Sequence, residues 1–247
     1  MMDTESLSMA TLVELAERLV GDYDVIDVLT VLSHRCVEAV GVDAAGVMLT
    51  SPLGELQFIA ASSESMKTLE LFQIHSNEGP CVDCIRNGLA ITNEALSETD
   101  GRWPMFAPRA IAQGIHAVHC LPMRLRGRTI GALNLFRADQ GPLTEANVVV
   151  ARCLADVATI AILQHQSTYD ASTSNTQLNN AINSRLVIEQ AVGMICQATS
   201  CDKDDAFERL QAHAMNHQEG LTVMARRVVG KSIGPSDLDE RERQVSA

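Results

Sequence analysis

The chain has 247 residues, of which 46% are hydrophobic and 20% are charged, and its formal net charge is -12. This composition excludes wholesale disorder, and the length suits two domains of ordinary size. The negative charge argues against nonspecific adsorption to nucleic acid, because phosphate contacts need lysine and arginine side chains.

The N-terminus and the cysteines indicate the compartment. The first residues, MMDTESLSMA, lack the basic start and apolar stretch of a signal peptide, and no apolar run approaches the roughly 20 residues that a bilayer needs. The seven cysteines are odd in number and scattered over both halves of the chain, unlike a disulfide framework. We therefore expect a cytoplasmic protein with no membrane partner, whose thiols are mostly reduced and buried.

The first elements are expected to be two helices and a β-hairpin. Apolar residues recur at three- to four-residue spacing from Leu12 to Leu19 and again from Val25 to Cys36, which predicts two helices. Strand-like segments follow at 44–50 and 56–60, and the Pro and Gly between them favour a tight turn.

The middle of the chain is expected to carry a loop-rich crossover and a second hairpin. Residues 62–109 look irregular, contain the only tryptophan, Trp103, and could wall a pocket. Segments 117–125 and 129–136 predict the second hairpin. Residues 143–166 then predict a long helix that Thr144 caps, with one apolar stripe formed by Val150, Cys153, Val157 and Ile160.

Together these elements predict an α+β domain over residues 8–166, in which helices flank an antiparallel sheet. Residues 167–177 are polar and are expected to be a linker or a helical connection. Residues 178–230 predict an all-α bundle of three helices, and the polar tail 231–247 is expected to be disordered.

The three expected helices of the bundle have distinct signals. The first, over 178–199, carries a heptad-like seam suited to a partner helix, formed by Leu178, Ala181, Arg185, Ile188, Val192 and Ile195. The second begins at Asp202, with Asp205 three residues later. The third runs from Leu221 to a stop signal at Gly230, with Arg226 and Arg227 on its polar face.

Residues 178–230 resemble the ANTAR family over roughly the whole length of that module. The resemblance is carried by LNNAINSRLVIEQAVGMICQ and DKDDAFERLQAHAMNHQEGLTVMARRVV. It implies a three-helix domain that binds paired hairpin loops of leader RNA and prevents a terminator from forming, usually as a dimer. One position departs from the family, because Val192 stands where a basic residue is common.

The candidate RNA contacts are the cations of this bundle. Residues 178–230 hold five Lys and Arg against six Asp and Glu, whereas residues 1–177 hold 11 against 21. Any RNA contact must therefore depend on a local patch, for which the candidates are Arg185, Lys203, Arg209, Arg226 and Arg227, with Lys231 beside them. The alternative for each of them is a solvated helix face.

The segment EGPCVDCIRNG, from Glu78 to Gly88, resembles the GAF sensor domains that accompany ANTAR modules in actinobacteria. The resemblance implies a GAF fold over residues 8–166 with a pocket between the sheet and the crossover. In different members of the family that pocket holds cyclic nucleotides, tetrapyrroles, metals or nothing. The cofactor is therefore unknown, and a small-molecule ligand is one of the expected partners.

Cys81 and Cys84 form a CxxC pair, which suits a disulfide, a redox switch or half of a zinc site. A zinc site needs four ligands, and only His119 and Cys120 offer themselves at a distance. Thiols without special chemistry are the favoured interpretation, ahead of a redox sensor and then of a metal. His213 and His217, at i and i+4, lack a third ligand on the same helix, so we predict no metal site.

No GxGxxG, Walker, HExxH or GxSxG motif is present, so we predict that the protein is not an enzyme. The expected function is that of a signal-responsive, RNA-binding transcription antitermination regulator that acts as a homodimer through helices 143–166 and 178–199. The alternative is a ligand- or redox-sensing protein-interaction module that does not bind RNA. A redox-regulated catalyst built on Cys81 and Cys84 is a third, weaker hypothesis.

Overall fold

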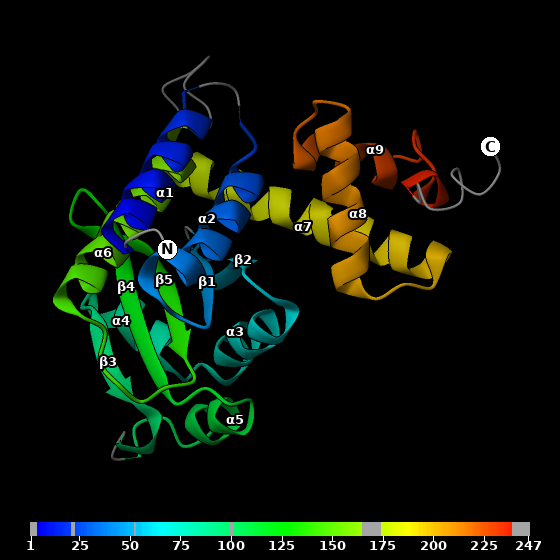
Figure 1. Ribbon diagram of the computed structural model, residues 1–247. Coiled ribbons are helices and arrows are strands. Elements are labelled where there is room, and N and C mark those ends of the chain that lie inside the picture. The colour runs from blue at the N-terminus through cyan, green and yellow to red at the C-terminus, as the bar shows by residue number, and fades with distance from the viewer. Residues whose placement is uncertain (1–3, 21–22, 52, 99–100, 165–173, 239–247) are drawn as a thin grey trace. The chain divides into compact units, whose positions relative to one another are not determined.

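The computed structural model describes residues 4–20, 23–51, 53–98, 101–164 and 174–238 (Figure 1). The chain divides into two compact units, Met1–Asn179 and Asn180–Ala247. Most of the expected linker, and residues 239–247 of the expected tail, lie outside the described residues. The part of the linker that is described, from Ser174 onward, already belongs to a helix.

The first unit begins with the two expected helices, α1 (Thr4–Arg18) and α2 (Val25–Val40). The Asp24 carboxylate caps α2 by accepting a 2.9 Å hydrogen bond from the backbone N–H of Ile26. Gly41 ends the helix with a φ of 71°, a left-handed conformation that glycine adopts without steric cost. Helix α1 packs on α2, which in turn covers one face of the sheet (Figure 1).

The sheet of this unit has five antiparallel strands in the order β2-β1-β5-β4-β3. Both expected hairpins are confirmed, as β1 (Ala44–Thr50) with β2 (Leu56–Ala61) and β4 (Ala117–Leu125) with β5 (Arg128–Arg137). Strand β3 (Ile91–Ala95) joins at the edge beside β4. Its polar sequence, ITNEA, carries no apolar alternation, so the sequence gives little indication of this strand.

Helices cover both faces of the sheet (Figure 1). On one face α2 packs on β1 and β2, and α6 (Glu145–Gln164) packs on β4 and on α2. The opposite face carries α3 (Glu64–Ser76) and α4 (Pro80–Asn87), and α5 (Phe106–Ala112) packs on α3 and on the short 3-10 helix η1 (Leu96–Glu98). The α+β architecture predicted from the sequence is confirmed.

The expectation that residues 62–109 are irregular is wrong, because α3, α4 and β3 lie within this stretch and α5 begins in it. Helix α3 is hard to recognise because its buried face mixes the apolar residues Met66 and Leu69 with the polar residues Lys67, Glu70 and Gln73. An apolar repeat of period 3.6 is the main signal of an amphipathic helix, and this mixture erases it.

Helix α6 is real, and Thr144 caps it as expected, by accepting a 3.1 Å bond from the N–H of Asn147. The expected stripe from Val150 to Ile160, however, faces away from the core. The side that packs inward is instead rich in alanine, with Ala151, Leu154, Ala155, Ala158, Ala161 and Ile162. Because α6 is apolar on both sides, it is long and apolar enough to cross a bilayer. The sequence was expected to contain no apolar stretch of this length.

The second unit contains most of α7 (Ser174–Thr199), α8 (Lys203–Asn216) and α9 (Leu221–Val229). The three expected helices are confirmed, and the Asp202 carboxylate caps α8 through the N–H of Asp205 at 2.9 Å. A 3-10 helix, η2 (Pro235–Leu238), packs on α8 and buries Leu238. The expectation of disorder from residue 231 onward therefore differs from the structure over 235–238.

Candidate functional site

A row of small and polar residues crosses the centre of the sheet on the α3 side. In the strand register Asn134 of β5 lies opposite both Gly46 of β1 and Cys120 of β4. The Cys120 thiol donates to the Asn134 amide oxygen at 2.6 Å, and the Asn134 amide nitrogen donates to Glu70 Oε1 at 2.7 Å. A hydrogen-bonded chain therefore runs from the sheet to helix α3.

Glu70 is the centre of this chain and is fully buried. Its second carboxyl oxygen accepts a 2.9 Å bond from the Gln73 side-chain amide. Burial raises the pKa of Glu70 to about 8, although the bonds from Asn134 and Gln73 act in the opposite direction. Near neutral pH the carboxyl is thus mostly protonated, which avoids an isolated buried charge.

Two glycines leave the space that this network occupies. A Cβ on Gly46 would lie 2.4 Å from Glu70 Oε1, and a Cβ on Gly79 would lie 2.3 Å from Gln73 Oε1. Gly79 also has a φ of 136°, which L side chains rarely adopt. The Gln73 oxygen can therefore accept a 3.0 Å bond from the backbone N–H of Cys81 at the start of α4.

The CxxC thiols lie beside the network and are both fully buried. Cys81 Sγ lies 3.4 Å from Met48 Sδ, and Cys84 Sγ lies 3.5 Å from the carbonyl oxygen of Cys120. Burial raises the pKa of the Cys81 thiol despite its place in the first turn of α4. Because the thiolate is the reactive form, this environment disfavours rapid redox chemistry.

His119 lies on the opposite face of the sheet from Cys120, because successive residues of a strand alternate between faces. Its Nδ1 accepts a 2.8 Å bond from the N–H of Asn93, and burial lowers the pKa of the imidazole to about 4. His119 and Cys120 therefore cannot complete a zinc site with Cys81 and Cys84. Across residues 4–238 outside the gaps, no three His, Cys, Asp or Glu side chains are arranged to hold a metal ion.

The space between the sheet and the crossover was expected to be a pocket. In the described residues an apolar cluster around Trp103 and Phe106, both buried, lies between the strands and the crossover. The Trp103 indole N–H donates to Asp83 Oδ2 at 2.9 Å, which fixes the crossover to α4.

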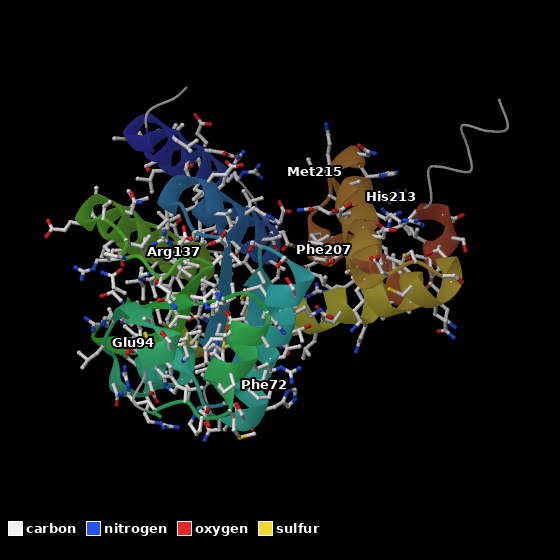
Figure 2. The ribbon with its side chains drawn as sticks, turned by 60° about the horizontal axis from the view of Figure 1, so that its bottom comes forward. Phe72, Glu94, Arg137, Phe207, His213 and Met215 are labelled. Carbon is white, nitrogen blue, oxygen red and sulfur yellow. The ribbon has the colours of Figure 1, made fainter. Side chains whose placement is uncertain are left out.

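The candidate cations of the second unit fall into two groups. Arg185 is only 8% exposed, pairs with Glu189 one turn along α7, and lies over the Phe207 ring of α8 at 5.7 Å. Phe207, His213 and Met215 all project from α8 (Figure 2). Arg227 pairs with Glu219 at 2.6 Å, and Arg209 also has a partner. These three guanidinium groups are already engaged within the chain.

Lys203, Arg226 and Lys231 form the second group. All three side chains are exposed, and within the described part of the chain none of them makes an ion pair. Lys203 begins α8, Arg226 lies on α9, and Lys231 stands two residues after the end of α9. An unpaired, solvated cation is free to exchange its counterions for RNA phosphates without first breaking an ion pair.

The seam of α7 was expected to face a partner helix. Its members Leu178, Ala181, Ile188, Val192 and Ile195 are all buried within the single chain, and Val192 is 3% exposed. The departure at Val192 therefore places a core residue where the family commonly has a basic one. In the single chain these side chains are therefore covered.

His213 and His217 stack with ring centroids 4.2 Å apart, and His217 Nδ1 lies 2.8 Å from the carbonyl oxygen of His213. This pair caps the C-terminus of α8, where carbonyl groups lack helical partners.

The residues that sequence reasoning missed are Glu70, Gln73 and Asn134. The sequence does show these polar residues within an apolar strand and helix. It does not show that they contact one another, because they are far apart in the chain.

Two family models match the chain. The GAF domain matches residues 22–163, and the ANTAR domain matches residues 176–229. No curated protein matches the chain in sequence.

Solved structures resemble the first part of the chain. The GAF domain of an Acinetobacter phosphoenolpyruvate-protein phosphotransferase is 12% identical with a TM-score of 0.52, covering 70% of this chain and 100% of that one. Its counterpart from Coxiella burnetii is 14% identical with a TM-score of 0.52, covering 65% and 95%. Free methionine-R-sulfoxide reductase from Neisseria meningitidis is 13% identical with a TM-score of 0.50, covering 67% and 92%. At these identities the similarity establishes the fold alone.

Proposed function

We propose, from the premise that this chain belongs to the GAF domain family and carries an ANTAR domain after it, that it is a cytoplasmic transcription antitermination regulator. In this proposal the first domain senses a signal, and the second binds hairpins of leader RNA as part of a dimer. ANTAR is an RNA-binding antitermination module and GAF is a sensor domain. The pair suggests a regulatory protein of the kind found in actinobacteria and not an enzyme.

The observation that carries the RNA-binding proposal is the set of unpaired cations Lys203, Arg226 and Lys231. They supply positive charge on a chain that is acidic overall. Three cations per protomer give modest affinity, and a dimer that engages two linked hairpins would multiply it through effective concentration. Arg185, Arg209 and Arg227 then support the bundle, and contact with phosphate would require them to exchange partners.

The surface that we propose for the dimer is the outward stripe of α6. Val149, Cys153 and Ile160 are exposed there, and Val150 and Val157 are half-buried. Helix α1 packs against α6 and exposes Met9 and Val13, which extends the apolar surface. A long helix that is apolar on both faces suits a second copy on its free face. This stripe replaces the covered seam of α7 in our proposal.

The dimer is tested by sedimentation of the full chain. We expect Ile160→Glu to shift the chain to monomer, whereas Leu53→Glu, at an exposed turn residue, leaves the dimer intact. Mild oxidation should also join two copies through Cys153 if the helices run parallel. A monomeric wild-type chain at micromolar concentration would contradict the dimer.

The RNA function is tested with transcripts recovered by crosslinking from the native host. We expect the wild-type chain to retard a transcript with two hairpins, and to bind much more weakly when one hairpin is removed. For Ile160→Glu the difference in affinity between the two-hairpin and one-hairpin transcripts should largely disappear, because avidity needs both protomers. Failure to retard any recovered two-hairpin transcript while the dimer is present would favour the protein-interaction alternative.

A further inference from the structure

The segment after α9 forms a recess on the second unit that lies partly outside the ANTAR match, which ends at residue 229. The recess has a volume of about 400 Å³ and opens to solvent. One wall comes from α7, with Met194 and Gln197, and the other from Lys231, Ile233 and Pro235. Its volume falls in the range of small-molecule sites, which is roughly 300–1,000 Å³.

Backbone hydrogen bonds fix the second wall. The N–H groups of Ser232 and Ile233 both donate to the carbonyl oxygen of Arg227, at 2.9 and 3.2 Å. Gly234 N–H donates to Asp237 Oδ2 at 3.0 Å, so the Asp237 carboxylate is itself engaged. Leu238 then anchors the segment by burial. The recess is thus built before any ligand arrives, which lowers the entropic cost of binding.

The lining combines an apolar floor with two polar groups. Met194 provides a polarisable thioether, and Ile233 and Pro235 provide flat aliphatic surface, all of which suit the face of an aromatic ring. The exposed amide of Gln197 can donate and accept at once, as the edge of a nucleobase requires. Lys231 places an unpaired ammonium at the rim, two residues after the end of α9, which carries the exposed Arg226.

We propose that this recess receives one unpaired base of the RNA loop, with the adjoining phosphate on Lys231. The proposal rests on the RNA-binding function above and deepens it. Phosphates on Lys203 and Arg226 hold the RNA without regard to sequence, whereas a base in the recess supplies discrimination among loops. A nucleotide fits the site by charge and shape together, since the apolar wall alone would take any hydrophobic group.

The first test uses the four ribonucleoside monophosphates as probes on the full chain, with 13C-methyl-labelled methionine. Met194→Leu identifies the Met194 signal by its loss. We expect at least one nucleotide to shift this signal in a saturable way, and inorganic phosphate alone to leave it in place. Absence of a shift with all four nucleotides at tens of millimolar would overturn the proposal.

The second test uses RNA and a matched pair of variants. Ile233→Asp places a carboxylate in the recess, and Val223→Asp places one on an exposed part of α9 outside it. We expect about a tenfold loss of RNA affinity for Ile233→Asp, as for the removal of one base-stacking contact, and much less for Val223→Asp. Circular dichroism must show both variants folded.

Abasic substitutions in the RNA loop separate the outcomes. If the base at one loop position occupies the recess, RNA that is abasic at that position should bind the wild-type chain and Ile233→Asp with equal affinity. If RNA binds but no loop position shows this behaviour, the recess proposal fails while the proposed function stands. If the wild-type chain binds no RNA, the proposed function fails, and the nucleotide titration still reports on the recess.

Discussion

The two units of this chain place their polar residues in opposite ways. In the first unit Glu70, Gln73 and Asn134 are buried in one hydrogen-bonded chain. In the second unit the core is apolar apart from a few groups such as Arg185, and Lys203 and Arg226 are exposed and form no ion pair with any residue that the structure describes. Buried polar groups determine the stability and specificity of packing, whereas exposed cations are available to bind a partner.

This contrast is consistent with the proposal that one acidic chain combines sensing with RNA binding. A signal that changes the first unit must act through a tightly packed network, in which a displaced hydrogen bond leaves a buried group unsatisfied. In our proposal RNA binds the second unit at its surface and needs no rearrangement of the core.

The largest expected effect is the pH dependence that Glu70 gives to the first unit. Below pH 4.5 the carboxyl is protonated in the folded and the unfolded chain. Between pH 4.5 and about 8 the unfolded chain loses the proton and the folded chain keeps it, so the free energy of unfolding falls as pH rises. The slope is about 1.4 kcal/mol per pH unit, or roughly 3 kcal/mol over most of the window.

Denaturant unfolding at several pH values measures this slope. We expect Glu70→Gln to flatten it, because the variant cannot ionise, while Glu55→Gln on the exposed hairpin leaves it unchanged. An unchanged slope in Glu70→Gln would show that the carboxyl is not protonated in the folded state, contrary to our account of the network.

A smaller loss of stability is expected when the space beside Glu70 is filled. Gly46→Ala places a methyl group 2.4 Å from the carboxyl oxygen, so α3 or β1 must shift. Overpacking of this kind costs about 1–3 kcal/mol, which chemical denaturation of the full chain can detect. Wild-type stability in Gly46→Ala would mean that the network is loose enough to move.

The corresponding change in the second unit should have the opposite sign and the smallest size. Gly193 lies within α7, and a Cβ there meets nothing within 4 Å. Gly193→Ala should therefore stabilise the chain by about 0.5–1 kcal/mol, the difference in helix propensity. A thermal melt that shows destabilisation would indicate that a partner approaches the backbone at Gly193.

Local signals explain which parts of the structure the sequence predicts well. The turns at Gly54 and Gly127 and the caps at Thr144 and Asp202 act within a few residues of their position, so the hairpins and the helix starts can be read directly. The direction of a helix face depends on distant partners. For this reason Val150 and Ile160 look like core residues on α6, although the sheet packs against the alanine-rich side.

The same distinction applies to the site residues. Composition identifies the cations of the second unit, but only the fold shows that Glu219 engages Arg227 and that Phe207 and Glu189 engage Arg185. Likewise, the CxxC spacing marks Cys81 and Cys84, and the strand alternation that separates His119 from Cys120 becomes decisive only once β4 is placed. Contacts between residues far apart in sequence account for most of what was missed.

RNA binding by the second unit is proposed to depend on its exposed cations, which bind RNA phosphates. Its most direct test is the salt dependence of binding to a two-hairpin transcript, for the wild-type chain, Lys203→Ala with Arg226→Ala, and Arg128→Ala on the first unit as control. We expect the double variant to lower affinity by at least about tenfold and to reduce the slope of log K against log salt by roughly 1–2 per protomer. The control should match wild type. A double variant with wild-type affinity and slope would contradict the claim.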